Sequence, residues 1–350
     1  MQAKIIDPSK DKRWDEFVTD HPQGTLFHLS NWARVLQKTY GYIPCYSVLE
    51  DSDKKIKAGC PFFLVRSWLT GTRLVCLPFT DNCLPLAISC ENIELLFAAA
   101  IEKANQEKAD YIEVRGEHPN ISLQGLHFEN HSYYRLFRLD LSRGKDSVWK
   151  GLGKRVRRRV RRAQRTNLII EKSETEKGMR DFYLLNLATR KKHGIPPQPY
   201  IFFETIWQEL ILNGLGFVLF AKYQGIPIAG DVFFIYKDTI YDKFSAWERN
   251  YSKYCPNHLV KWHIIQYGCQ NRFRYLDSGR TSQDNLGLMA FKRGWGMEEI
   301  DLPYYYWPTV KGVTPIKERS LKYRMISSVM RWAPTAISRA AGELFYKHLG

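Results

Sequence analysis

The 350-residue sequence has no long apolar run and none of the common short catalytic signatures. A membrane-spanning helix needs about 18 to 20 predominantly apolar residues, and neither such a run nor a signal-peptide stretch is found. GxSxG, HExxH and P-loop motifs are also missing. The seven cysteines are odd in number and form no CxxC pair. These absences predict a reduced, cytoplasmic protein without a metal site.

Positive charge, by contrast, is abundant and concentrated. Lysine and arginine outnumber aspartate and glutamate by 52 to 36, a net charge of +16 at pH 7. Eleven basic residues lie between Arg143 and Arg165, with Asp146 as the only acid among them. Because like charges three or four residues apart on a helix repel each other, this run predicts an anionic partner. RNA, a nucleotide diphosphate and anionic lipid headgroups are all compatible with it, whereas DNA is not expected.

The same run has the pattern of an amphipathic helix. Val156, Val160 and Ala163 recur every three or four residues, which gives the helix one apolar stripe among arginines. A solvated helix face is the plainer interpretation. The planar guanidinium group, however, can donate two hydrogen bonds to one phosphate. We therefore predict that this helix binds the phosphates of a donor substrate through Arg155, Arg158, Arg159 and Arg162.

The chain contains two copies of one pattern. A strand, a tight turn, an Ala-Gly pair and a further strand occur at 45–65 and again at 217–236. Each copy continues with a helix and a strand that ends in glycine, at 111–116 and 274–279. Two helices precede each copy. Two copies of one α/β unit explain this repetition better than chance does.

This order of elements, with several local motifs, resembles the FemAB-like transferases, which carry two GNAT-type acyltransferase domains on one chain. The most specific motifs are the segment 275–279, Tyr-Leu-Asp-Ser-Gly, and the segment 291–296, Phe-Lys-Arg-Gly-Trp-Gly, which is similar to an FKxGFG-like turn of the family. The resemblance implies an α/β (α+β) fold of two tandem GNAT-like domains, each a mixed, mostly antiparallel sheet flanked by helices. We expect a first domain at 1–145, completed by 303–350, and a second at 146–302 that opens with the basic helix.

The resemblance also implies an activity. We expect an acyl- or aminoacyltransferase that forms an amide on a cell-envelope precursor or exopolysaccharide component by direct attack of an acceptor amine. Catalysis would then be mostly positioning and stabilisation of an oxyanion. The partners would be an anionic donor and an envelope glycan or lipid-linked precursor. Two alternatives stay open: an acetyl-CoA-dependent N-acetyltransferase of sugar amines, and a non-catalytic RNA- or membrane-binding protein.

The donor is expected as a co-substrate, aminoacyl-tRNA or acyl-CoA, and no tightly bound cofactor is implied. Acyl-CoA-dependent GNAT enzymes hold pyrophosphate on a glycine-rich turn before a helix N-terminus. The corresponding turns here, 80–86 and 249–257, contain no glycine. This absence disfavours acyl-CoA and favours aminoacyl-tRNA or another carrier-bound acyl group.

The candidate site residues follow from the resemblance. Lys292 matches a lysine that stabilises developing charge or a substrate phosphate, and Asp277 and Tyr241 complete the catalytic set. Pro196 stands where the family's acceptor-binding arginine is expected, and His193 is a candidate general base. For each of these residues a core or surface role is the plainer alternative. The predicted substrate-binding residues are Trp32, Lys38, Arg190, His193, Tyr200 and Asp242.

The C-terminal segment 320–350 is amphipathic and basic, and it carries Trp332. This composition fits peripheral docking on the inner face of an anionic membrane. It fits equally a return of the chain onto the first domain, which is the interpretation we favour.

Overall fold

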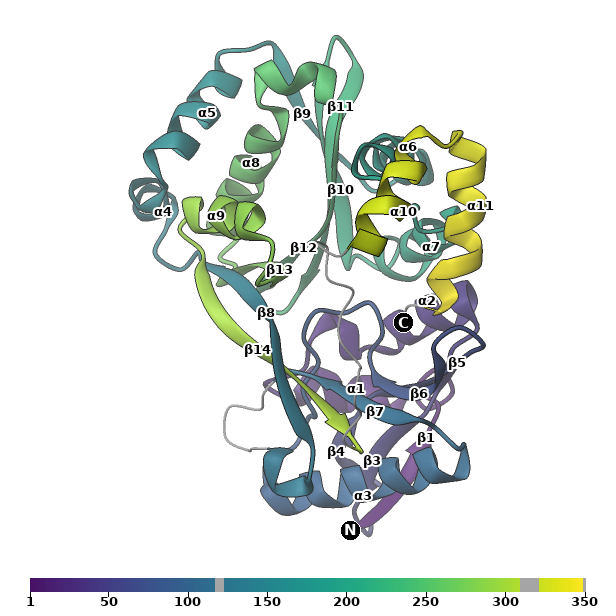
Figure 1. Cartoon of the computed structure of the whole chain (residues 1–350). Helices are drawn as coiled ribbons and strands as arrows, with labels where there is room; N and C mark the ends of the chain where they lie inside the picture. The colour runs from purple at the N-terminus through teal and green to yellow at the C-terminus, as the bar shows by residue number, and fades with distance from the viewer. Residues whose placement is uncertain (117–122, 309–320, 349–350) are drawn as a thin grey trace. The chain divides into compact units, whose positions relative to one another are not determined.

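The computed structural model describes residues 1–116, 123–308 and 321–348, which divide into two compact units (Figure 1). The first unit comprises residues 1–134, 301–308 and 345–348, and the second comprises residues 135–300 and 321–344. The boundary was expected near residue 145 but falls between Tyr134 and Arg135. The new boundary falls within strand β8 (Glu129–Asp140).

The first unit is built on mostly antiparallel strands with helices around them. Five strands lie side by side in the order β2-β5-β6-β7-β14, and three more in the order β1-β3-β4. Only β6 and β7 form a parallel pair among the pairings described for this unit, and helix α3 makes the crossover between them. The elements are α1 (Arg13–Asp20), α2 (Ser30–Tyr40), α3 (Cys90–Gln106), β1 (Gln2–Ile6), β2 (Ile43–Pro44), β3 (Tyr46–Glu50), β4 (Ile56–Cys60), β5 (Phe62–Ser67), β6 (Gly71–Cys76), β7 (Tyr111–Arg115) and β14 (Glu298–Trp307).

The second unit repeats this arrangement, so the predicted fold class is confirmed. Its strands lie in the order β8-β13-β12-β11-β10-β9, with β12 and β13 parallel and β9 to β12 antiparallel. Helices α5, α8 and α9 lie on one side of the β10–β11 pair, and α6 and α7 lie on the other (Figure 1). The elements are α4 (Lys145–Gly151), α5 (Lys154–Gln164), α6 (Glu176–His193), α7 (Tyr200–Ile206), α8 (Pro256–Gln270), α9 (Leu286–Gly294), α10 (Leu321–Trp332), α11 (Thr335–Phe345), β9 (Leu168–Ser173), β10 (Gly216–Tyr223), β11 (Ile226–Tyr236), β12 (Thr239–Trp247) and β13 (Tyr275–Ser282).

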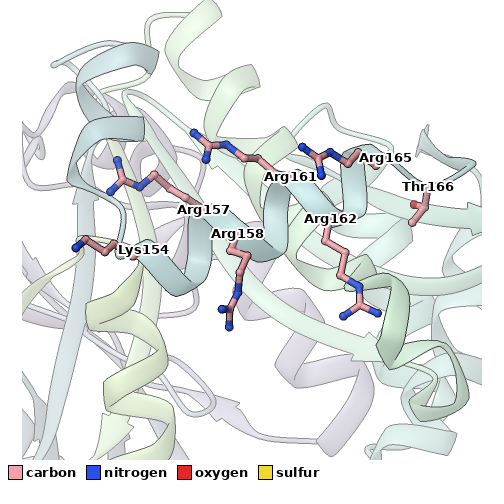
Figure 2. Close-up of a pocket in the computed structure, with 7 residues that line it drawn as sticks. All are labelled: Lys154, Arg157, Arg158, Arg161, Arg162, Arg165 and Thr166. Atoms are coloured by element: carbon pink, nitrogen blue, oxygen red, sulfur yellow. The ribbon is translucent and has the colours of Figure 1, made fainter.

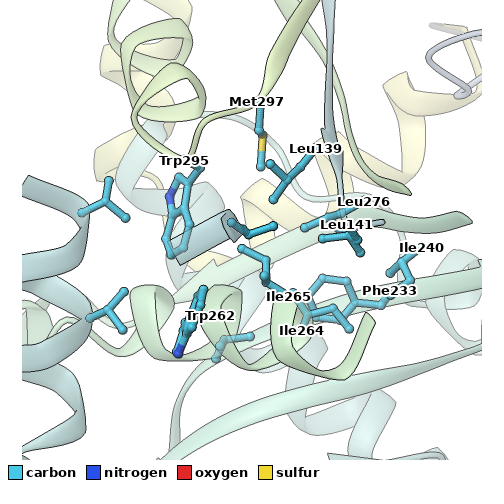
Figure 3. Close-up of a cluster of buried hydrophobic side chains, with 14 of the residues drawn as sticks. Leu139, Leu141, Phe233, Ile240, Trp262, Ile264, Ile265, Leu276, Trp295 and Met297 are labelled. Carbon is cyan, nitrogen blue, oxygen red and sulfur yellow. The ribbon is translucent and has the colours of Figure 1, made fainter. Parts of the chain in front are cut away.

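A hydrophobic core lies between the sheet of the second unit and helix α8 (Figure 3). Phe233, Ile240 and Leu276 come from three adjacent strands and belong to the same buried cluster as Ile264 and Ile265 of α8. Helix α5 packs against this cluster with its valines, so the apolar stripe predicted from the sequence is buried. The arginines between those valines are therefore left at the surface.

The C-terminal helices pack on the second unit and do not return to the first. Helix α10 contacts α6, and Gly342 of α11 lies against the backbone of Pro197. Only the final turn joins the first unit, where the Tyr42 hydroxyl donates to the Lys347 carbonyl (3.0 Å). The segment 303–350, expected to complete the first domain, is thus divided: strand β14 from residue 303 on and the final turn belong to the first unit, whereas α10 and α11 up to residue 344 belong to the second. In the described part of the chain, no helix is long and apolar enough to cross a bilayer.

Candidate active site

Strands β12 and β13 run in parallel for three residue pairs and then part. The last pair is Tyr241 with Asp277. Beyond it, β12 stays paired with β11, where a β-bulge interrupts the register opposite Asp242. Asp242 and Ser278 are therefore the first residues past the parallel ladder. We call this point the fork of the second unit. Bulges often occur beside active sites, where they redirect side chains.

Side chains from four elements meet at the fork. Asp242 Oδ2 accepts hydrogen bonds from Lys261 Nζ of α8 and from the Ser278 hydroxyl (3.1 Å). Lys292 Nζ of α9 donates to the carbonyl oxygens of Ser278 (2.6 Å), Gly279 (2.9 Å) and Arg280 (3.3 Å). All these contacts are buried or partly buried. The two lysines thus fix the position of both strands where they separate.

The charges at the fork are strongly perturbed. Burial lowers the pKa of Lys261 to about 8, with the nearby Lys292 acting in the same direction and Asp231 opposing it. Asp231 on β11 is fully buried, and burial raises the pKa of its carboxyl group against the attraction of Lys261. Asp242 Oδ1 is also buried and accepts no hydrogen bond from the described residues. Buried charges without full hydrogen bonding are costly and are common at functional sites.

The three predicted catalytic residues lie together at this fork. Tyr241 is the register partner of Asp277, and Lys292 binds carbonyls of the β13 residues that follow Asp277. Burial raises the pKa of Tyr241, and the charges of Asp277 and Asp238 raise it further, so the phenol stays protonated at neutral pH. Asp277 is partly exposed, and its Oδ1 accepts a hydrogen bond from the Gly279 amide (2.7 Å). Since Lys292 already donates to three carbonyls, its charge acts on the site through space.

The four arginines predicted to bind phosphate line one pocket of about 600 Å³, which we call the arginine pocket. The first turn of α8 contributes Asn257 and His258, and the pocket is completed by Trp247, Ser252, Cys255 and Phe291. A helix N-terminus carries partial positive charge and free amide groups. His258 of the pocket and Lys261, which binds Asp242, lie three residues apart on one side of α8, so this helix brings the pocket next to the fork. In the described residues no arginine of α5 forms an ion pair, which leaves their charge available to an anion.

His258 lies at the inner wall of the arginine pocket. Burial, together with the charges of Arg159 and Arg155, lowers its pKa to about 4. Its imidazole packs against the rings of Phe291 and Trp295, with ring centroids 5.8 Å apart in each case. At neutral pH this histidine is therefore uncharged, and it adds no positive charge of its own to the pocket.

A second hollow of about 840 Å³ follows the outer side of α5, and we call it the outer groove. Figure 2 shows Arg157, Arg161 and Arg165 along one side of the helix and Arg158 and Arg162 along the other. Lys154 and Thr166 complete the lining. Arg158 and Arg162 line both the outer groove and the arginine pocket. The basic surface is thus continuous and larger than one pocket.

Of the predicted substrate-binding residues, Asp242 lies at the fork, and three others lie elsewhere in the second unit. Arg190 and His193 are in the last turn of α6, and Tyr200 begins α7, on the face of the sheet opposite α8 (Figure 1). Burial lowers the pKa of His193, and nearby basic side chains lower it further. Trp247 links this region to the arginine pocket, since the centroid of its ring lies 4.0 Å from Lys192 Nζ.

The structure corrects one predicted substrate contact in the first unit. Trp32 on α2 is fully buried and packs edge-on against Phe27, with ring centroids 5.2 Å apart. An indole without any exposed surface belongs to the core and does not face a substrate. Lys38, on the same helix, is exposed. The helix is amphipathic, and the tryptophan lies on its apolar side.

Sequence reasoning missed Lys261, Asp231 and His258. A signal for the first two was present, since each is a charged residue within an apolar run, Leu-Val-Lys-Trp and Gly-Asp-Val-Phe. Charged residues are rarely fully buried unless they are paired or functional. His258 gave no signal of its own. In the described ranges no group of histidine, cysteine and acidic side chains could hold a metal ion.

Comparisons with known proteins agree with this fold. Residues 152–293 match the family model of the acetyltransferase (GNAT) domain. The lipid II:glycine glycyltransferase of Staphylococcus saprophyticus is 21% identical over an alignment of 372 positions. The alignment covers 82% of this chain and 88% of that protein. The crystal structure of FemX has a TM-score of 0.71 at 17% identity, covering 87% of this chain and 97% of that one. A tandem GNAT protein from the clavulanic acid biosynthesis pathway has a TM-score of 0.54 at 11% identity, with coverages of 87% and 98%.

The fold, the fork and the matching domain model define an acyltransferase of the GNAT type. Over most of its length the chain is similar to a lipid II:glycine glycyltransferase and has the fold of FemX, in agreement with the resemblance to FemAB-like transferases found in the sequence.

Proposed function

We propose that the protein transfers an aminoacyl group from aminoacyl-tRNA to an amine of a lipid-linked cell-envelope precursor. The similarity to a lipid II:glycine glycyltransferase supports the class of acceptor. The observation that carries the proposal is the arginine pocket, which adjoins the fork and contains four arginines without acidic partners. An acidic donor can bind there with its acyl end at the fork.

The fork suits the reacting end of the donor. Past Tyr241 and Asp277 the two strands no longer pair with each other, so backbone groups on their facing edges can bind an acyl group. The acceptor amine attacks the acyl carbon, the C–N bond forms and the ester C–O bond breaks. One amine proton ends on the leaving ribose oxygen. Positive charge and amide donors near the carbonyl oxygen stabilise the oxyanion.

Lys292 and Lys261 act mainly as positioning residues in this proposal. Lys292 holds the turn at Ser278, and Lys261 holds Asp242 on the opposite strand. Together they set the separation of the strands, and small displacements of a reacting group lower the rate steeply. Lys292→Ala should therefore lower kcat far more than it raises KM for the donor.

The extent of the basic surface favours tRNA over a small donor. One diphosphate needs only the arginine pocket. The outer groove continues the basic surface along the other side of α5, where a polynucleotide backbone could place further phosphates. Helix α5 has 11 residues and is therefore about 16 Å long at 1.5 Å per residue. An acyl-CoA donor is the second candidate, because the matching domain model is that of GNAT acetyltransferases.

A matched pair of variants separates these donors. Arg159 lines only the arginine pocket, and Arg161 lines only the outer groove. Binding of charged tRNA and of acetyl-CoA is measured for Arg159→Ala and Arg161→Ala at two salt concentrations. If tRNA is the donor, both variants weaken tRNA binding and lower its salt dependence. Saturable acetyl-CoA binding that only Arg159→Ala weakens would replace the tRNA proposal.

The acceptor is tested by transfer assays with radiolabelled aminoacyl-tRNA. A lipid-linked peptidoglycan precursor is compared with an amino sugar of the kind found in exopolysaccharides. Label in the lipid-linked product alone supports the proposal, and label in the sugar alone contradicts it. Arg190, His193, Tyr200 and Lys38 stay predictions for the acceptor side. Tyr200→Phe and Arg190→Ala should raise KM for the acceptor without changing donor affinity.

A further inference from the structure

The C-terminal helical hairpin of α10 and α11 has one face packed against the second unit. The backbone of Ser327 lies against Gly194, the αL residue that ends α6 (φ 67°). Gly342 lies against Pro197, and Ser338 is buried. Glycine at two contact points permits a close approach of backbones. The hairpin is thus a fixed part of this unit, beside α6 and α7 (Figure 1).

The opposite side of the hairpin exposes large apolar side chains at its tip. Trp332 is 88% exposed, the highest value for a large hydrophobic residue in the described ranges. Val329, one turn earlier on α10, is 67% exposed, and Ile337, in the first turn of α11, is 56% exposed. Residues three apart on a helix lie on the same side. Single exposed apolar residues are ordinary, but three around one turn are a feature that calls for a partner.

Basic side chains gather next to this apolar tip. Arg331 is exposed, and its charge acts on His193 together with those of Arg190 and Lys192 at the end of α6. Arg339 is also exposed, and Glu343 is the only acid between residues 327 and 344. The tip therefore combines an apolar surface with positive charge. This combination is typical of a segment that lies in the interface of an anionic membrane, with tryptophan at the level of the headgroups.

We propose that the tip of the α10–α11 hairpin docks on an anionic lipid bilayer. Trp332, Val329 and Ile337 enter the interface, and Arg331 with the basic end of α6 contacts headgroup phosphates. The charge complementarity decides for a lipid surface over an apolar protein partner. This docking does not depend on which acceptor the enzyme uses.

The experiment is co-sedimentation of the full-length protein with vesicles of phosphatidylcholine, with and without phosphatidylglycerol. Trp332→Ala should lower the partition coefficient roughly tenfold and abolish the blue shift of tryptophan emission on vesicles. The matched control is Trp68→Ala, because Trp68 is 74% exposed but lies in the first unit. Both variants remove an exposed indole and should leave the fold intact, which circular dichroism checks.

The arginines of α5 also attract anionic vesicles, so their share is measured separately. Salt at about 0.5 M is enough to screen exposed charges. Arg161→Ala should therefore reduce only the vesicle binding that this salt concentration removes. Trp332→Ala should reduce the vesicle binding that remains in salt. Equal binding of the Trp332→Ala and Trp68→Ala variants would overturn the proposal. So would a concentration-dependent dimer in light scattering that Trp332→Ala dissolves, because the tip would then bind a second copy of the chain.

Activity distinguishes this proposal from the proposed function. Trp332→Ala should slow transfer to an acceptor embedded in vesicles and leave transfer to a water-soluble acceptor unchanged. If the protein binds vesicles through Trp332 but transfers no aminoacyl group, the docking proposal stands and the proposed function is refuted.

Discussion

The two units share one topology but differ at the fork. In the first unit β6 and β7 pair in parallel at three positions and then part, as β12 and β13 do in the second. In the first unit the space past the ladder is closed by the chain itself. The Cys83 amide donates to the Arg115 carbonyl (2.9 Å), and the Arg115 guanidinium donates to the Thr80 carbonyl (3.1 Å) and to Glu113 (2.6 Å). The second unit has a pocket with unpaired arginines beside its fork.

This difference shows that two units of the same topology can surround their forks with different side chains. Both forks precede a helix N-terminus, at Cys90 for α3 and at Pro256 for α8. The first turn of α3 carries Glu91, whereas the first turn of α8 faces the arginines of α5. A phosphate would be repelled in one place and attracted in the other. Function thus depends on the side chains around a fork that both units possess.

The largest effect is expected from breaking the closed fork of the first unit. Arg115→Met leaves the carboxylate of Glu113 buried without its partner, which costs about 3–5 kcal/mol. Urea denaturation measures the loss in free energy of unfolding. The control is Arg66→Met, whose ion pair with Glu107 is exposed on the arginine side and contributes at most about 1 kcal/mol. If Arg115→Met instead weakened donor binding in a folded protein, the first fork would also be a donor site.

The fork of the second unit should respond to pH through Lys261. The pKa of Lys261 is about 8, below the ordinary 10.5. Between these pH values the unfolded chain binds more protons than the folded chain, so stability rises with pH. The rise is at most roughly 3 kcal/mol, at about 1.4 kcal/mol per pKa unit. Lys261→Met should remove this rise in unfolding experiments from pH 7.5 to 10.5, and an unchanged pH dependence would refute the assignment.

Removing charge from the open pocket should affect binding and leave stability unchanged. Arg158 and Arg162 line both the arginine pocket and the outer groove. The double variant Arg158→Ala/Arg162→Ala should weaken donor binding by at least roughly 100-fold, since each charge-assisted hydrogen bond contributes about 1.5–3 kcal/mol. A double variant of the exposed Lys10 and Lys54 in the first unit removes equal charge. A similar loss in both double variants would mean that only net charge matters.

The smallest effect is expected on helix α2 of the first unit. Trp32→Phe should lower the free energy of unfolding without changing KM for the acceptor, because the indole is part of the core. Lys38→Ala should change stability by less than about 0.5 kcal/mol and raise KM for the acceptor. Steady-state kinetics and urea denaturation of both variants test this. If Trp32→Phe raised KM for the acceptor at unchanged stability, Trp32 would be a substrate contact after all.

Features of the site that depend on neighbouring residues in the sequence could be predicted, and features that depend on distant residues could not. The α5 helix was predicted from the spacing of Val156, Val160 and Ala163, and the same spacing predicted that its apolar stripe is buried among arginines. Trp32 was ambiguous, because an amphipathic helix does not reveal which of its neighbours covers the apolar side. Lys261 was missed, since its partner Asp242 is 19 residues away on another element.

The sequence by itself determined the two-fold repeat, the family resemblance and the position of the arginine helix, because these depend on local order, composition and periodicity. Only the tertiary structure decided that the fork of the first unit is closed and that the arginine pocket lies beside the fork of the second. It also decided that Lys261 and Lys292 hold the second fork, and that α10 and α11 pack on the second unit with Trp332 exposed. Those outcomes depend on which surfaces meet across long stretches of chain. The packing of distant segments against each other determines which charged side chains are buried and which partners they have.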